Sequence, residues 1–73
     1  MTNNEKLRTC IERSGLLKYF VATQIFRITP KTLTYWLKDV VPRKTKHKKD
    51  IKKFTEKYCS GNINLIANIE EWE

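Results

Sequence analysis

At the centre of the chain stands the segment Ile28-Thr29-Pro30-Lys31-Thr32-Leu33-Thr34-Tyr35-Trp36-Leu37-Lys38. A threonine followed by a proline signals the start of a helix, because the hydroxyl caps a free N–H and proline suits the first helical position. At helical spacing, the apolar residues Leu33, Trp36 and Leu37 share one face. The opposite face holds Lys31, Thr34, Tyr35 and Lys38, within an arc of about 100°. The segment predicts an amphipathic helix over 29–38, which ends by Asp39 because Val41 precedes Pro42.

The residues ahead of this segment predict two helices. One runs over 4–14, where apolar and small residues recur at helical spacing: Leu7, Cys10, Ile11 and Ser14. Asn3 or Asn4 is expected to cap its start. The second helix runs over 17–26, a stretch with few polar residues. Residues 27–29 then form a tight connection to the central helix.

The residues after the central helix predict a basic loop, a further helix and a short last helix. The loop covers 42–46. The helix over 47–59 has two opposite faces, one of His47, Ile51, Phe54 and Tyr58 and one of Lys49, Lys52, Lys53 and Lys57. The spacing of Ile66, Ile69 and Trp72 favours a last short helix within 63–73, although 63–66 taken alone would also suit a strand.

The composition fits one small domain over residues 1–73. Hydrophobic residues make up 40% of the chain, which is enough for a single core. We expect an all-α fold, a compact four- or five-helix bundle. Its expected core holds Leu7, Ile11, Val21, Ile25, Leu33, Trp36, Leu37, Ile51 and Phe54. The sequence has no run of 18 or more apolar residues and does not start like a signal peptide, so we expect a cytoplasmic protein.

Few residues are candidates for catalysis or metal binding. His47 is the single histidine, and Cys10 and Cys59 stand 37 and 12 residues from it, without the spacing of a metal site. Both cysteines lie on apolar helix faces, so we expect buried free thiols that act as small hydrophobic residues. The two glycines cannot form a glycine-rich phosphate loop. We expect no enzyme, no metal site and no cofactor.

The charge is high and unevenly distributed. The chain has 15 Lys and Arg against 8 Asp and Glu, a formal net charge of +7. Residues 41–59 hold most of this excess, whereas 60–73 contain three glutamates and no lysine or arginine. A concentrated basic segment is typical of a protein that binds a polyanion. Nucleic acid is the first candidate, and an anionic membrane or an acidic protein surface are the others.

Residues 17–39 resemble the helix-turn-helix of phage repressors and Cro-type regulators, the lambda-repressor-like class. The resemblance rests on Val21-Ala22-x-x-Ile25 and on the segment 28–38 quoted above. The chain departs from the family pattern in two ways. Phe26-Arg27 replaces the glycine of the turn, and the spacing from Ala22 to Ile28 is one residue longer than usual. The resemblance implies a sequence-specific double-stranded DNA-binding protein, a small transcriptional regulator or repressor of phage or mobile-element type, in a bacterial or phage-infected cell.

The resemblance also implies the residues that touch DNA. The helix 29–38 would enter the major groove and read bases with residues on its outer face: Pro30, Lys31, Thr34, Tyr35 and Lys38. Phosphate contacts would come from Arg27, Thr29, Arg43, Lys44, Lys46 and Lys48. The C-terminal segment holds a second apolar set beyond the core that the four preceding helices supply. Independently of the resemblance, we therefore expect the last helix, 62–73, to form a homodimer through Ile66, Ile69 and Trp72, or else to fold back on the core of its own chain.

A second resemblance leads to a different architecture. Residues 28–37, followed by Val41-Pro42-Arg43, are similar to the start of winged-helix proteins of the mercury-resistance-regulator and excisionase type. In those proteins a basic two-stranded wing follows, and 42–50 would take that place. An architectural DNA-binding accessory factor and a protein-binding inhibitor module are further alternatives.

Overall fold

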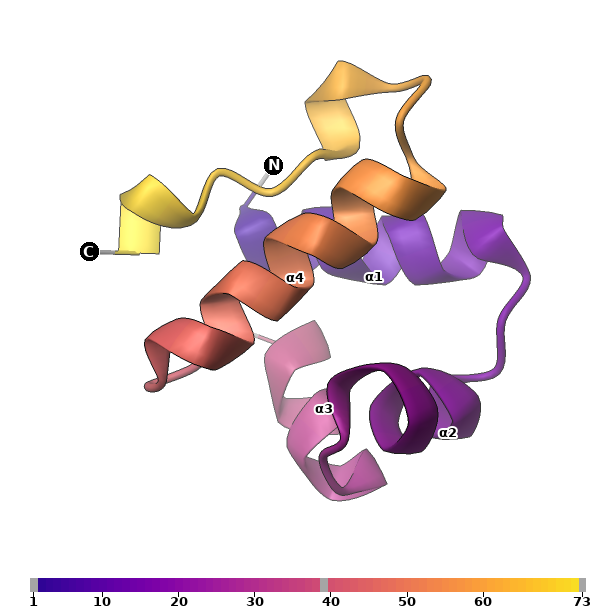
Figure 1. Cartoon of the computed structure of the whole chain (residues 1–73), viewed down its shortest axis with the longest axis vertical. Helices are drawn as coiled ribbons and strands as arrows, with labels where there is room; N and C mark the ends of the chain where they lie inside the picture. Colours follow the sequence, from indigo (N-terminus) through magenta and orange to yellow (C-terminus); the bar gives the residue numbers. More distant parts are fainter. Residues whose placement is uncertain (1, 39, 73) are drawn as a thin grey trace.

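The computed structural model describes residues 2–38 and 40–72, and its regular elements are all helical (Figure 1). They are α1 (Asn3–Ser14), α2 (Lys18–Phe20), the π-helix η1 (Val21–Phe26), α3 (Pro30–Leu37), α4 (Thr45–Tyr58), and the 3₁₀ turns η2 (Ile63–Leu65) and η3 (Ile69–Trp72). α1 and α4 cross at the centre, with α2 and α3 on one side and the C-terminal segment on the other. The all-α bundle is confirmed.

None of the helices in the described ranges, 2–38 and 40–72, is long and apolar enough to cross a lipid bilayer.

Thr2 caps the first helix, so the prediction that Asn3 or Asn4 would do so is wrong. The Thr2 hydroxyl accepts a hydrogen bond from the Glu5 N–H at 3.2 Å, and the Glu5 carboxylate accepts one from the Thr2 N–H at 3.4 Å. This reciprocal pair satisfies two free N–H groups and leaves both asparagines inside the first turn. Gly15, at φ 74°, ends the helix in the left-handed conformation.

Asn3 and Asn4 instead connect α1 to distant parts of the chain. Both are buried. The Asn4 amide donates to the carbonyl oxygens of Trp36, at 2.7 Å, and Val40, at 3.0 Å. The Asn3 amide donates to the Asn68 carbonyl at 2.7 Å, and the Asn68 N–H donates back to Asn3 Oδ1 at 2.9 Å. The start of α1 therefore holds both the end of α3 and the C-terminal segment.

The core matches the prediction except in the second helical segment. Its buried hydrophobic residues are Leu7, Cys10, Ile11, Val21, Ala22, Phe26, Leu33, Trp36, Leu37, Ile51, Phe54, Cys59, Leu65 and Ala67. Ile25 was expected in this core but is only partly buried. Phe26 takes the central place, with its ring centroid 5.7 Å from that of Trp36 and 5.4 Å from that of Phe54.

Residues Val21–Phe26, before α3, form a π-helix, which spans most of the stretch between Ala22 and Ile28. A π-helix carries more residues in each turn than an α-helix, so one extra residue is absorbed without a break. The segment closes where the Ile28 N–H donates to the Ala22 carbonyl at 2.9 Å. Arg27 lies between them in the left-handed conformation, at φ 55° and ψ 49°. It adopts the backbone geometry that a glycine most easily provides.

The last helix differs from the prediction. Residues 63–72 do not form one α-helix or a strand, but two 3₁₀ turns separated by residues 66–68, of which Ile66 is extended. Asparagine side chains compete with helix formation here, because Asn62 Oδ1 accepts from the Asn64 N–H and Asn68 Oδ1 accepts from the Glu70 N–H. Leu65 and Ala67 are buried, and the Ala67 N–H donates to the Thr55 hydroxyl at 3.0 Å. This part of the segment folds back on the core of its own chain.

We expect Asn4→Ala to lower the free energy of unfolding by about 1–3 kcal/mol, because it leaves the carbonyl groups of Trp36 and Val40 without their donor. Urea denaturation followed by circular dichroism measures the change. The matched control is Asn64→Ala, an exposed asparagine, for which we expect a change within about 0.5 kcal/mol. Equal stability of Asn4→Ala and the wild type would contradict the structural role of Asn4.

Candidate nucleic-acid interface

α3 presents the polar face that the sequence predicts. Leu33, Trp36 and Leu37 are buried in the core, whereas Pro30, Lys31, Thr34, Tyr35 and Lys38 are exposed. The Thr29 hydroxyl caps the helix by accepting from the Thr32 N–H at 3.2 Å. The helix ends at Leu37 as expected, and Asp39 lies outside the described residues. The amphipathic character of this helix is confirmed.

The exposed side chains of α3 differ in what they offer a ligand. The Thr34 hydroxyl donates to the Pro30 carbonyl at 3.0 Å, so in this conformation it has no proton to donate to a ligand. Within the part of the chain that the structure describes, Lys31 and Tyr35 make no side-chain hydrogen bond, and Tyr35 is 45% exposed. Lys31 and Tyr35 thus present polar groups on this face that are available to a ligand.

The loop after α3 places cations beside Tyr35. Tyr35, Arg43 and Lys44 line one depression of about 260 Å³, whose other walls are Thr32, Trp36, Val40, Val41, Pro42 and His47. The His47 ring packs on that of Trp36, with centroids 5.1 Å apart. This contact fixes the start of α4 against α3, so the arginine and lysine of the loop lie next to the outer face of α3.

A second group of cations lies beside the turn before α3. Arg27 and Lys46 line a depression of about 270 Å³ together with Ile25, Phe26, His47 and Asp50. His47 lines this depression and the one beside Tyr35, so the two groups of cations are neighbours. Arg27, Arg43, Lys44 and Lys46, all exposed, form what we call the basic rim around His47.

Lys53 and Lys57 extend this side of α4 and were not among the predicted site residues. They line a depression of about 220 Å³ with Ile25, Asp50, Phe54 and Tyr58. Their signal in the sequence is spacing, because residues seven and eleven positions after Lys46 share its side of a helix. Asp50 lines both this depression and the one beside Arg27, and its carboxylate lowers the positive charge there.

Lys48 is separate from the other predicted phosphate contacts. Its side chain is half-buried, and Nζ donates to the Trp72 carbonyl at 3.4 Å. It therefore points to the C-terminal segment and not to the basic rim. Ile66, Ile69 and Trp72, predicted to form a dimer interface, are half-buried in the same chain, and Trp72 packs against the core.

The remaining candidate groups are the two cysteines and the side chains that could bind a metal. Cys10 and Cys59 are buried free cysteines, as expected. Burial disfavours the thiolate and, with the neighbouring Cys59 thiol, raises the pKa of Cys10 to about 12, so this thiol stays protonated at neutral pH. Across residues 2–38 and 40–72, histidine, cysteine and carboxylate side chains form no cluster that could hold a metal ion.

No family model matches this chain, and neither the curated proteins nor the solved structures include a match. The resemblance to the lambda-repressor-like class therefore stays a prediction.

We expect Arg27→Gly to raise the free energy of unfolding by about 0.5–1 kcal/mol. The left-handed conformation costs a residue with a side chain roughly 1–2 kcal/mol, which exceeds the roughly 0.5–1 kcal/mol of extra backbone entropy that glycine loses on folding. Thermal and urea denaturation measure the difference. The control Arg27→Lys keeps both the charge and the strain and should match the wild type. A less stable glycine variant would contradict the assignment of strain to this turn.

Proposed function

We propose that this protein binds double-stranded DNA in a sequence-specific manner and regulates transcription, with α3 in the major groove. An α-helix with its side chains is about 10–12 Å wide, which fits a groove of about 12 Å. By the sequence resemblance, the protein would be a small regulator or repressor of phage or mobile-element type.

The observation that carries this proposal is the basic rim next to the outer face of α3. Lys31 and Tyr35 offer groups that can bond to base edges, whereas Arg27 and Lys46 lie beside the turn ahead of the helix and Arg43 and Lys44 beside its middle. A helix that reads bases needs cations around it that fix its position on the phosphates. This arrangement supports DNA binding over a solvated amphipathic surface.

The winged-helix alternative is not supported by the fold. Residues 42–50, which would form the wing, are a loop and the first turns of α4. An architectural role without sequence preference uses the same cations, and the comparison of Lys31 with Lys46 below separates it from sequence-specific binding.

We expect affinity for duplex DNA to fall steeply with salt. If the basic rim and Lys53 neutralise roughly five phosphates, the logarithm of the association constant should fall with the logarithm of salt concentration at a slope of about −4 to −5. Fluorescence anisotropy of a labelled duplex over a salt series measures this slope. A slope near zero would contradict binding through phosphates.

We expect Lys31→Ala and Lys46→Ala to affect binding differently. Lys31 lies on the outer face of α3, so its loss should relax preference at one base position by about 1–3 kcal/mol. Lys46 lies on the basic rim, so its loss should weaken binding to all duplexes alike. The measurement is competition between the duplex preferred in selection from a random pool and its single-base variants. Uniform loss for both variants would favour the architectural role.

A further inference from the structure

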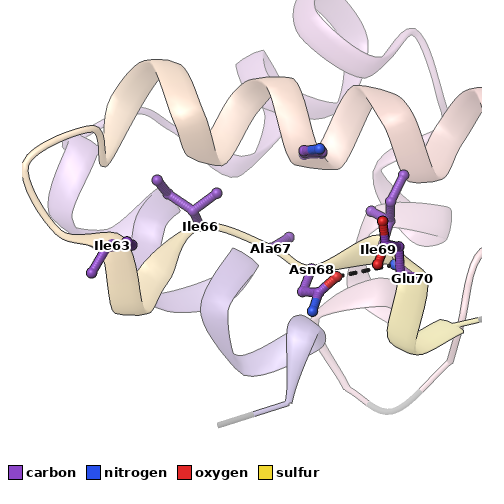
Figure 2. Close-up of a pocket in the computed structure, with 7 residues that line it drawn as sticks. Ile63, Ile66, Ala67, Asn68, Ile69 and Glu70 are labelled. Atoms are coloured by element: carbon purple, nitrogen blue, oxygen red, sulfur yellow. Dashed lines mark hydrogen bonds between the residues drawn. The ribbon is translucent and has the colours of Figure 1, made fainter.

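We propose that two copies of this chain associate through the groove between α4 and the C-terminal segment. Figure 2 shows this groove, with Ile63 and Ile66 at one end and Ile69 and Glu70 at the other. Its volume is about 590 Å³, and Ala67, Asn68 and Lys52 of α4 complete its lining. The inference adds self-association to the proposed DNA binding and is tested without DNA, so either can fail alone.

The groove exposes apolar groups that the chain itself leaves uncovered. Ile63 is 81% exposed, and Ile66 and Ile69 are half-buried, whereas Leu65 and Ala67 between them turn into the core. The inner side of the segment is thus covered by the core of its own chain, whereas the apolar side chains of its outer side remain in contact with water. Covering this outer side removes isoleucine surface from water, which favours association.

The distribution of charge indicates that the occupant is a second copy. At +7, two copies repel each other wherever their basic surfaces meet. Residues 60–72 contain no lysine or arginine and hold Glu70 and Glu71, so repulsion between copies is weakest there. The groove is also complementary to itself, because Lys52 stands on its α4 side and Glu70 on the opposite side. A two-fold axis along the groove brings Lys52 of each copy toward Glu70 of the other.

The position of the groove is compatible with DNA binding by both copies. The C-terminal segment lies across α1 and α4 from α3 (Figure 1), so pairing through it leaves both α3 helices uncovered. Trp72, predicted from the sequence as an interface residue, packs against its own core. The structure assigns the anchoring role to Ile63, the most exposed of the large hydrophobic residues described.

The first test is the mass of the protein in solution, measured by sedimentation equilibrium from micromolar to millimolar concentration. We expect the wild type to dimerise and Ile63→Lys to remain monomeric. Ile63 is exposed, so this change should leave the circular dichroism spectrum and the melting temperature unaltered. The matched control is Leu17→Lys, which replaces a similarly exposed apolar residue (76%) at the N-cap of α2 and should dimerise like the wild type. A monomeric wild type, or a dimer of Ile63→Lys as tight as that of the wild type, would overturn the proposal.

The second test reverses the charges at the rim. Lys52 forms an ion pair with Glu56 at 3.9 Å, but both side chains are half-exposed, so this weak pair leaves Lys52 free to reorient. We expect Lys52→Glu and Glu70→Lys each to weaken dimerisation about tenfold, and the double variant to return to within about threefold of the wild type. Failure of the double variant to recover would overturn the two-fold arrangement along the groove.

Discussion

The ring of Phe26 packs against Trp36 of α3 and Phe54 of α4, and the rest of the fold depends on this aromatic contact. It joins the end of the π-helix to the two helices that follow it in the chain. Because Phe26 is held in the core, the next residue, Arg27, must turn the chain toward α3 in a left-handed conformation. Trp36, one of the two rings that contact Phe26, also packs against His47, and this contact holds the first turn of α4 against α3.

These interior contacts determine which side chains reach the surface. With Leu33, Trp36 and Leu37 fixed in the core, Lys31 and Tyr35 must point outward. Phe26, Trp36 and His47 also hold the turn before α3 and the loop after it in place. The cations of the basic rim therefore lie close together around His47. The candidate interface is therefore positioned by packing, while the charges that compose it make few contacts within the protein.

The sequence predicts the elements whose signals are local. Thr29-Pro30 and the apolar spacing of α3 are sufficient to place that helix and its outer face, because capping and helical periodicity act within a few residues. The π-helix could not be predicted in this way, since its extra residue is accommodated only because Phe26 packs in the core.

Other features depend on partners far away in the chain. Asn3 and Asn4 look like helix caps in the sequence, but their partners lie 32 to 65 residues away, and Thr2 with Glu5 already caps the helix. The C-terminal residues show helical spacing, but the backbone N–H and carbonyl of Asn68 form hydrogen bonds with the Asn3 side chain and not within a helix. The spacing of Lys46, Lys53 and Lys57 puts them on one side of α4, but the sequence does not show that Ile25 and Arg27 lie against that side.

The pairing of Asn3 with Asn68 has a consequence for how the chain reaches its native state. The two residues are 65 positions apart, in a chain of 73. During synthesis the first turn of α1 is made before its partner, so the buried Asn3 amide stays unpaired until Asn68 has been made, 65 residues later. Contacts between such distant residues close late, because the loop between them must be ordered first. Asn68 thus completes the hydrogen bonding of the first turn of α1, so the helix that is made first is among the last parts of the fold to be satisfied.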